Sequence, residues 1–307
     1  MQTPARPHLE RLLKAVSKMP ALNTAVVHPV GKTSLLGAVE AAKEGLINPI
    51  LIGPEQRIKK AATEAKLDIS AYELVATEHS HDSAKIAVDM AKGCSVSAIM
   101  KGKIHTDELM GAVVSREGGL RTGRRMSHVF AFDVPTYPRP LFITDAAINI
   151  EPDLETKADI IRNVIDLAIL LDIKVPRVAI LSAVETVTSK IESTLHAAAL
   201  CKMADRGQIK GGLLDGPLAF DNAVSEESVK IKGIKSDVAG KAEVLVVPDI
   251  EAGNMLAKQL EYLANAEGAG IVLGAKVPVV LPSRADDAVS RLAACALAVI
   301  MVHNSKL

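Results

Sequence analysis

Short apolar runs alternate with longer stretches of helical periodicity along most of the chain. The short runs are rich in Val, Ile and Leu, as buried strands are, and the stretches between them repeat apolar residues every three or four positions. Strands that alternate with helices in this way predict a parallel sheet covered by helices on both faces. In the first third of the chain, the expected strands are 23–29, 47–54, 71–77 and 96–102, and the expected helices are 33–45, 58–67 and 83–93.

The middle of the chain is less regular. The stretch "SREGGLRTGRRMSH" at 115–128 is rich in arginine and glycine and is expected to form a basic loop. Two apolar runs joined by the short link "TYPRP" predict an antiparallel hairpin. Segment 221–241 is expected to be a long loop with little regular structure, and the apolar last helix, "DAVSRLAACALAVIMVHNS", is expected to pack centrally. Alternation returns after residue 153, with helices expected at 153–171, 190–205 and 252–266 and strands at 175–184, 211–218, 243–249 and 269–282.

The composition argues against several classes of protein. Aromatic residues make up only 2% of the 307 residues, and a protein that stacks on nucleic-acid bases needs more of them. The 36 basic and 36 acidic residues cancel, so no overall field attracts DNA or an anionic membrane. Hydrophobic residues make up 49%, enough for a large core, and the length favours two domains or one large α/β domain.

The cysteines indicate a reducing environment. Cys94, Cys201 and Cys295 lie far apart without a CxxC pair, which argues against a structural zinc site or a disulfide framework. Their apolar surroundings indicate structural roles. The N-terminal stretch has no apolar core of signal-peptide length, and no window approaches the roughly 18 apolar residues of a transmembrane helix. We therefore expect a soluble, cytoplasmic protein.

Two stretches concentrate positive charge where a parallel sheet would place its ligands. "MKGKIHTDEL" follows an apolar strand, and open α/β sheets bind ligands beyond the carboxyl ends of their strands. "GLRTGRRMSH" adds glycines that allow close backbone approach and guanidinium groups that suit phosphate. The alternatives are solvated surface charge and a flexible basic loop without a ligand. The candidate anion contacts are Lys101, Lys103, His105 and Thr106 in the first stretch and Arg121, Arg124, Arg125, Ser127 and His128 in the second.

Three expected strands end in acidic or amide residues. Such residues can cap the helix that follows a strand, or they can line one site of mixed polarity at the carboxyl edge of the sheet. Three such ends in one chain favour a shared site. The residues are Asp145 and Asn149, then Asp215, Asp221 and Asn222, and finally Asp249, Glu251 and Asn254.

Two other motifs are better explained as helix starts. "HPVGKTS" ends like a phosphate-binding P-loop, but Val26 stands where that loop needs a glycine, so we expect Thr33 or Ser34 to cap a helix. "EHSHDS" clusters two histidines with two carboxylates, but it lacks the third histidine that metal ligation would favour. We expect Ser80 or Asp82 to cap the helix there.

Several stretches together resemble one enzyme family. "TAVVHP", "KGKIHT", "GLRTG", "ADRGQIK", "DGPLAFDNAVS", "VPDIEAGN" and "VVLPSRADDA" resemble, in this order, the phosphate acetyltransferase/butyryltransferase family over most of the chain. "GLRTG", "DGPLAFDNAVS" and "SRAD" resemble its butyryltransferase branch, which also occurs fused to enoyl-CoA hydratase domains. The resemblance implies reversible transfer of an acetyl or butyryl group between coenzyme A and inorganic phosphate. It also implies that coenzyme A is a substrate and that no metal or cofactor is needed.

The resemblance implies a fold as well. We expect two three-layer α/β/α domains with mostly parallel sheets and the active site in the cleft between them, as in isocitrate and isopropylmalate dehydrogenases. The expected first domain comprises 1–140 plus 275–307, and the expected second domain comprises 141–274.

Catalytic roles are also implied, at the end of the strand "VPVVLP". Arg284 would hold the phosphate of the acyl phosphate, and Ser283 would hydrogen-bond the thiol sulfur or the developing oxyanion. In the acetyltransferase branch, an aspartate seven residues after that serine takes the thiol proton. Ser290 stands there in this chain, and Asp286 and Asp287 are nearby alternatives. Because arginines position phosphate without attacking it, and no GxSxG elbow is present, our hypothesis is direct attack in a ternary complex.

Two other functions are alternatives. A dehydrogenase of the same fold would use NAD(P) and bind Mg²⁺ and a hydroxy acid with the acidic strand ends. A relative that has lost its base would bind coenzyme A or phosphate without turnover. For the transferase we expect a homodimer or another homo-oligomer and an acetate or butyrate kinase as metabolic neighbour, without nucleic-acid or membrane partners.

Overall fold

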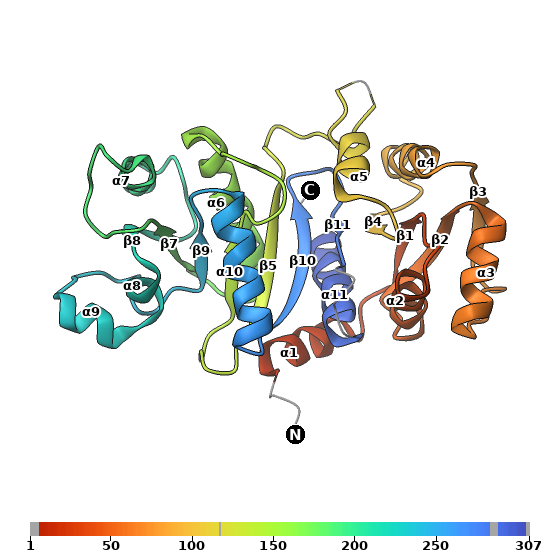
Figure 1. Ribbon diagram of the computed structural model, residues 1–307, viewed down its shortest axis with the longest axis horizontal. Coiled ribbons are helices and arrows are strands. Elements are labelled where there is room, and N and C mark those ends of the chain that lie inside the picture. Colours follow the sequence, from red (N-terminus) through yellow and green to blue (C-terminus); the bar gives the residue numbers. More distant parts are fainter. Residues whose placement is uncertain (1–5, 117, 283–287, 305–307) are drawn as a thin grey trace. The chain divides into compact units, whose positions relative to one another are not determined.

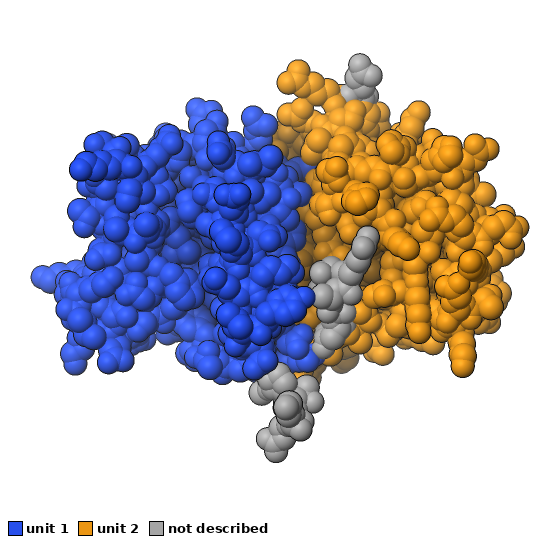
Figure 2. All heavy atoms as spheres, viewed as in Figure 1, with its two compact units in different colours: residues 1–8, 125–268 blue, residues 9–124, 269–307 orange. Residues whose placement is uncertain are grey.

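The chain forms a mixed α/β structure with mostly parallel strand pairing, which confirms the predicted class (Figure 1). The computed structural model describes residues 6–116, 118–282 and 288–304. Two compact units divide the chain, unit 1 with Met1–His8 and Arg125–Gly268 and unit 2 with Leu9–Arg124 and Ala269–Leu307 (Figure 2). Segment 125–140, expected in the first domain, groups with unit 1.

Unit 2 holds the strands of the first third of the chain and a pair from near its C-terminus. They are β1 (Leu22–Val27), β2 (Ile47–Gly53), β3 (Glu73–Ala76), β4 (Ala98–Lys101), β11 (Val279–Val280) and the larger part of β10 (Glu267–Leu273). Their order is β3-β2-β1-β4-β11-β10. All neighbours pair in parallel except β10 and β11, which are antiparallel. The parallel sheet expected here is confirmed.

The strand order determines which face each helix of unit 2 covers. The helices are α1 (Pro7–Val16), most of which belongs to this unit, α2 (Lys32–Lys43), α3 (Glu55–Ala65), α4 (Ser80–Lys92), α5 (Thr106–Val113) and α11 (Ala288–Asn304). The chain runs from β1 through β2 to β3 and then returns past β1 to β4. Because such crossovers are right-handed, α2 and α3 lie on one face and α4 on the other. In agreement, α2 packs against α3 and α11, whereas α4 packs against α5.

The last helix is buried, as its apolar sequence predicts. Every residue of α11 from 293 to 300 is less than 9% exposed. The helix packs against α2, where Arg291 forms an ion pair with Glu40 at 2.8 Å. In the part of the chain that the structure describes, no helix is both long and apolar enough to cross a membrane.

Unit 1 is built on β5 (Ser127–Asp133), β6 (Leu141–Thr144), β9 (Val244–Val246), β7 (Arg177–Leu181) and β8 (Leu213–Leu218), in that order across the sheet. β5 and β6 form the predicted antiparallel hairpin, and the other neighbours are parallel. Three longer helices flank these strands in sequence, α6 (Leu154–Leu170), α7 (Glu192–Asp205) and α10 (Ile250–Leu263).

The expectation of an irregular loop over 221–241 is wrong in its first half. Two short helices, α8 (Phe220–Val224) and α9 (Glu226–Lys232), occupy it. Ser225 caps α9 by accepting a hydrogen bond from the backbone N–H of Ser228, and Gly233 ends the helix in the left-handed region with φ 65°. Acidic residues in the first turn and lysines in the last turn suit the helix dipole. The sequence signals for α9 lie at its two ends, and the helix is too short for apolar periodicity to predict it.

Candidate active site

The carboxyl ends of β1 and β4 in unit 2 hold two of the predicted anion contacts. Connections from these neighbouring strands leave in opposite directions, and open α/β sheets bind ligands at such a switch point. Gly102 donates its N–H to the Val27 carbonyl at 2.9 Å, and Lys103 donates to the His28 carbonyl at 2.9 Å. These two bonds place Lys101 and Lys103 at the switch point, Lys101 half-buried and Lys103 exposed.

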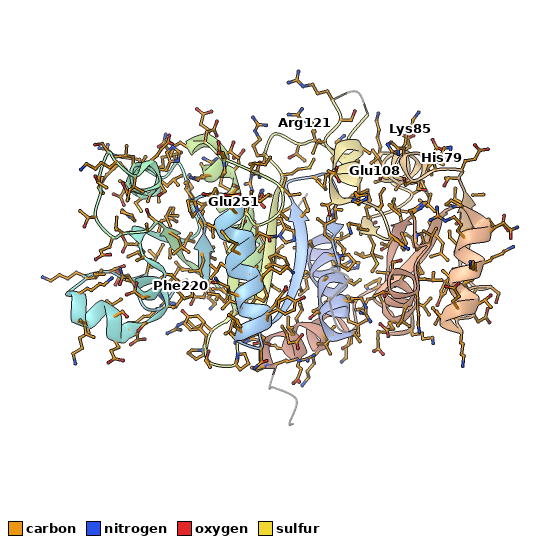
Figure 3. All side chains as sticks on the ribbon, viewed as in Figure 1. His79, Lys85, Glu108, Arg121, Phe220 and Glu251 are labelled. Carbon is orange, nitrogen blue, oxygen red and sulfur yellow. The ribbon has the colours of Figure 1, made fainter. Side chains whose placement is uncertain are left out.

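His105 and Thr106 follow at the beginning of α5. His105 is the N-cap residue and is exposed, and Thr106 is the first helical residue. Glu108 lies in the first turn of α5 (Figure 3) and pairs with His81 of α4 at 2.7 Å. The four residues predicted from "MKGKIHTDEL" therefore do lie together at one edge of the unit 2 sheet.

The segment around Arg121 is held by backbone and side-chain contacts. Arg121 forms an antiparallel bridge with Ala275, and the hydroxyl of Thr122 donates to the Gly274 carbonyl at 2.7 Å. The same hydroxyl accepts from the backbone N–H of Arg124 at 3.1 Å. The side chains of Arg121 and Arg124 are exposed. The backbone that carries them is held by these contacts, which argues against a freely flexible loop.

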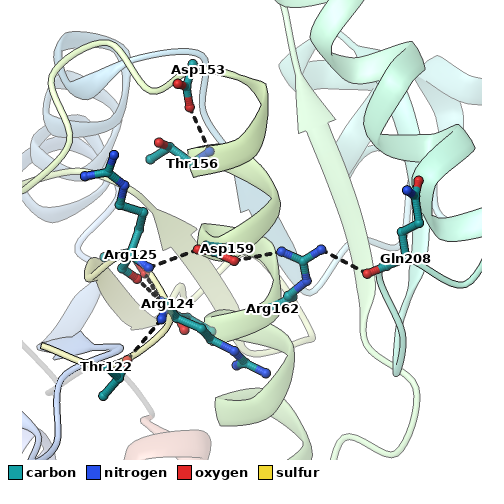
Figure 4. A network of polar contacts seen from close by, with 10 residues as sticks. Thr122, Arg124, Arg125, Asp153, Thr156, Asp159, Arg162 and Gln208 are labelled. Atoms are coloured by element: carbon teal, nitrogen blue, oxygen red, sulfur yellow. Dashed lines mark hydrogen bonds and ion pairs between the residues drawn. The ribbon is translucent and has the colours of Figure 1, made fainter.

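Arg125 begins unit 1 and is tied to α6 (Figure 4). Its backbone N–H donates to the Asp159 carboxylate at 3.0 Å. Asp159 also pairs with Arg162 at 2.7 Å, and Arg162 donates to the Gln208 carbonyl at 2.9 Å. This network fixes the backbone of Arg125, while its side chain is exposed.

Ser127 and His128 are strand residues of β5 with buried side chains, not loop residues. The Ser127 hydroxyl accepts a hydrogen bond from Asn163 of α6 at 2.9 Å. His128 stacks edge-on against Phe130 with ring centroids 4.4 Å apart, and its Nδ1 has no hydrogen-bond partner among the described residues. Burial lowers the pKa of His128 from 6.5 to about 3.

The buried His128 should make the free energy of unfolding depend on pH. Between pH 6.5 and about 3 the unfolded chain binds the imidazole proton and the folded chain does not, so stability rises with pH in that window. Each pH unit contributes about 1.4 kcal/mol. Urea unfolding of wild type and His128→Leu at pH 7 and pH 5 should show a smaller acid loss for the variant. His79→Leu, at an exposed position, is the control, and equal losses in wild type and His128→Leu would contradict the prediction.

Asp145 organises the turn that follows β6. Its buried carboxylate accepts from the N–H groups of Ala147 and Ile148 at 2.9 and 3.0 Å and from the Asn149 side chain at 2.6 Å. Asn149 also donates to the Met126 carbonyl at 2.8 Å. Burial raises the pKa of Asp145, and these hydrogen bonds oppose the shift. Asn149 therefore connects this turn to the start of β5.

The segment after β9 provides a helix cap, one of the two roles expected for acidic residues at strand ends. Asp249 caps α10 by accepting from the backbone N–H of Ala252 at 2.8 Å. Asn254 donates to the Ala146 carbonyl at 3.4 Å, which connects this end to the turn after β6. Glu251 is exposed in the first turn of α10 (Figure 3).

The strand end after β8 forms its own polar group. Asp215, expected after the strand, lies inside β8, where its carboxylate accepts from the backbone N–H of Gly216 at 2.8 Å. Asn222 is fully buried and donates to Glu185 at 3.2 Å. Lys232 of α9 pairs with Glu185 at 3.5 Å and with Asp221 at 3.2 Å. Asp221 and Asn222 are thereby linked through Glu185 and Lys232.

Lys157 is a candidate that the sequence analysis missed. It lies on α6, one turn after the capping residue Asp153, and only 4% of it is exposed. Its Nζ is 3.1 Å from Nδ1 of His196. Burial lowers the pKa of Lys157, and the carboxylates of Asp249, Glu192 and Asp153 oppose the shift. The sequence signal that could have identified Lys157 is its place on the apolar stripe of α6. That stripe continues with Ile160, Ile161 and Val164.

The two expected pairs of helix caps are wrong. α2 begins after Gly31, and Ser34 lies inside its first turn, where the hydroxyl donates back to the Gly31 carbonyl at 2.9 Å. α4 begins after His79, so Ser80 and Asp82 are helical residues and neither caps the helix. Serine can satisfy a carbonyl within the helix as well as an N–H at its start, so its presence does not locate the cap.

Four predicted catalytic residues, Ser283, Arg284, Asp286 and Asp287, lie outside the described residues. Ser290, at the position where the acetyltransferase branch has an aspartate, lies in the first turn of α11 and is 3% exposed.

The site described so far defines a broad class, an α/β protein with cationic side chains at the switch point of a parallel sheet. The family model described as "Phosphate acetyl/butaryl transferase" matches residues 75–299. A phosphate acetyltransferase of Rhizobium meliloti is 57% identical over 97% of this chain and 94% of its own length. A phosphate butyryltransferase of Clostridium beijerinckii is 38% identical over 97% of this chain and 99% of its own length.

A solved structure shares the fold. The branched-chain phosphotransacylase of Enterococcus faecalis superposes with a TM-score of 0.79 at 28% identity and covers 92% of this chain and 100% of its own. The chain belongs to the phosphate acetyl/butyryl transferase family.

Proposed function

We propose that this protein transfers a short acyl group reversibly between coenzyme A and inorganic phosphate. The 57% identity to a phosphate acetyltransferase over nearly the whole chain carries the proposal. The lysine pair at the β1–β4 switch point supports it, because both substrates are anionic and open α/β sheets bind ligands at such a point.

The proposed mechanism is direct attack. A phosphate oxygen attacks the thioester carbonyl, the carbon–oxygen bond forms, and the carbon–sulfur bond breaks as the thiolate of coenzyme A leaves and takes up a proton. In this proposal Arg284 holds the phosphate and Ser283 hydrogen-bonds the sulfur or the oxyanion. Asp286 or Asp287 passes the proton that the phosphate hydroxyl releases to the leaving sulfur, and in the reverse reaction it takes the proton from the thiol. Lys101 and Lys103 add positive charge that stabilises the anionic groups.

Two of the three cysteines, Cys201 and Cys295, support a mechanism without an acyl-enzyme, whereas Cys94, expected in apolar surroundings, is exposed. Burial raises the pKa of Cys201 and of Cys295 to about 12. The thiolate is the nucleophilic form of cysteine, so neither side chain supplies a nucleophile at neutral pH. A stable acyl-enzyme trapped with acetyl-CoA in the absence of phosphate would contradict direct attack.

Further features belong to the same proposal. We infer a homo-oligomer in a cytoplasmic setting and a neighbouring acetate or butyrate kinase that consumes the acyl phosphate. We also infer that the reaction needs neither metal nor cofactor. Within residues 6–116, 118–282 and 288–304, no group of three or more His, Cys, Asp or Glu side chains is arranged to hold a metal ion.

The experiment mixes the purified protein with coenzyme A and either acetyl phosphate or butyryl phosphate and follows thioester absorbance. We expect turnover with both, and kcat/KM higher for acetyl phosphate, because the relative at 57% identity is an acetyltransferase. A hydrophobic pocket discriminates by about 10- to 200-fold for each methylene that it excludes. Binding of coenzyme A without turnover would identify a non-catalytic relative. Reduction of NAD or NADP by a hydroxy acid would identify a dehydrogenase.

A further inference from the structure

Unit 1 has a switch point of its own, at the carboxyl ends of β7 and β9. These two strands are parallel neighbours. The helix that follows β7, α7, packs against β8, whereas the helix that follows β9, α10, packs against β6, so the two connections leave in opposite directions. Open α/β sheets bind ligands beyond strand ends of this kind. The polar side chains that α6, α7 and α10 bring to this edge are therefore candidates for a role in the reaction.

Lys157 is the buried cation among these side chains. It lies in the first turn of α6 and is 4% exposed. Among the described residues, no carboxylate lies within ion-pair distance of its ammonium, whose one hydrogen-bond partner is Nδ1 of His196 on α7, at 3.1 Å. More distant carboxylates, on Asp249, Glu192 and Asp153, favour the charged form and oppose the fall in pKa that burial causes. A buried charge without a close partner is costly, and an apolar side chain would pack there at lower cost, so the ammonium indicates a function.

The ammonium of Lys157 determines how His196 uses its two ring nitrogens. An ammonium can only donate, so Nδ1 of His196 accepts, and the single ring proton lies on Nε2. A proton on Nδ1 would place two positive charges 3.1 Å apart. Burial lowers the pKa of His196, and the charge of Lys157 lowers it further, although Glu192 and Asp153 oppose the shift. The pair therefore presents a neutral imidazole whose Nε2–H is a donor.

The surroundings of Nε2 indicate which acceptor fits this donor. Among the residues that the structure describes, Nε2 has no acceptor within hydrogen-bond distance, because the nearest carboxylate oxygen, on Glu192, is 3.8 Å away. The His196 side chain is 20% exposed, so a ligand can approach it. The negative charges of Glu192 and Asp153 nearby would repel an anion. An uncharged carbonyl oxygen is the acceptor that fits, and acyl-coenzyme A carries such oxygens in its thioester and in its two amides.

We infer that Lys157 is a positioning residue, which holds His196 as a neutral donor whose Nε2–H binds a carbonyl oxygen of the acyl-coenzyme A substrate. The inference rests on the proposed function, because it takes acyl-coenzyme A as the substrate. Lys157 acts through its hydrogen bond to Nδ1 and does not itself contact the substrate. Without the ammonium, Nδ1 can take up a proton. The resulting imidazolium would pair with Glu192, and its Nε2–H would no longer be available to the carbonyl oxygen.

The first test compares Lys157→Met with wild type in the reaction of acetyl-CoA with inorganic phosphate at pH 6 and pH 8. Methionine has a similar length and suits a buried helix position. With an ordinary pKa of about 6.5, about a quarter of the His196 side chains in the variant would be neutral at pH 6 and nearly all at pH 8. The ratio of variant to wild-type kcat/KM for acetyl-CoA should therefore be about two- to fourfold lower at pH 6 than at pH 8. A purely structural role would lower this ratio equally at both pH values.

Three further variants make the pH effect specific. Lys157→Arg keeps the charge and the N–H donors, so its ratio to wild type should be the same at pH 6 and pH 8. Lys157→Met combined with His196→Gln should also lose the pH difference, because glutamine supplies an N–H donor that does not titrate. Lys202→Met removes an exposed lysine from α7 and should match wild type at both pH values.

NMR of protein labelled with ¹⁵N in histidine reads the state of His196 without turnover. Its resonances are assigned by their absence from the His196→Gln spectrum. In wild type at pH 7, the imidazole should be neutral with its proton on Nε2. In Lys157→Met, the titration midpoint of His196 should move to higher pH. A wild-type proton on Nδ1, or a midpoint that does not move, would overturn the inference.

The kinetic outcomes separate this inference from the proposed function. Normal turnover in wild type, with a Lys157→Met ratio that is equal at pH 6 and pH 8, would overturn the inference and leave the transferase standing. A pH-dependent loss in kcat would assign the thioester carbonyl to His196, and a loss in KM for acetyl-CoA would assign an amide carbonyl; both support the inference. A loss confined to KM for inorganic phosphate would contradict it. Absence of turnover in wild type would reject the transferase and with it the substrate contact.

Discussion

Replacement of Arg284 by alanine should lower kcat for the reaction of acetyl phosphate with coenzyme A by roughly 100- to 1000-fold, the loss typical of removing one donor to a developing negative charge. In the role proposed for Arg284, the guanidinium fork would bind two phosphate oxygens at once and stabilise the phosphate as it leaves the acetyl carbon. In direct attack, positioning provides most of the rate enhancement, so the loss should appear in kcat as well as in KM for acetyl phosphate.

Two further variants make this result specific. Arg284→Lys keeps the charge but loses the fork, so its kcat should fall between those of wild type and Arg284→Ala. Arg206→Ala changes an exposed arginine at the end of α7 and should behave as wild type. Thermal unfolding of all three variants checks that the fold is intact. If Arg284→Ala kept more than a tenth of the wild-type kcat, Arg284 would not be the group that holds the phosphate.

The fold was predictable where apolar patterns are long. The runs that form β1, β2 and β4 are continuous because parallel strands are buried on both faces, and the helix periodicity between them is clear. Burial on both faces also explains why Ser127 and His128 were predicted to lie in a loop and not in a strand. β5 is also buried on both faces, so polar residues at its beginning enter the core, where a pattern alone suggests a loop.

The position of several candidate residues beside strand ends was predictable, but the use of each side chain was not. A carboxylate after a strand can bind a ligand, cap a helix or stabilise a turn. Asp249 caps α10, whereas Asp145 stabilises the turn after β6. The choice depends on which backbone N–H groups lie within reach, which is a property of three-dimensional structure. Lys157 was missed for a related reason, because His196, which lies 3.1 Å from its Nζ, comes from a different helix, α7.

Gly102→Ala should destabilise unit 2 and disrupt the lysine pair together. A Cβ at this position would collide with the Val27 carbonyl oxygen and lie 2.8 Å from both the carbonyl carbon and the carbonyl oxygen of His28. These are backbone atoms at the ends of a buried strand and its link, so they cannot move aside as a flexible side chain would. We expect the free energy of unfolding to fall by about 2–4 kcal/mol, at the upper end of the range for overpacking.

The same substitution should reduce kcat/KM by about tenfold or more, because Lys101 and Lys103 depend on the hydrogen bonds that Gly102 and Lys103 make to β1 and its link. The matched control is Gly111→Ala in α5, where a Cβ meets no atom within 4 Å. Alanine in a helix should stabilise that variant by about 0.5–1 kcal/mol and leave turnover unchanged. Urea unfolding and steady-state kinetics measure both effects. If Gly102→Ala matched the control in stability and activity, the close approach of these two strand ends would not be what holds the lysines in place.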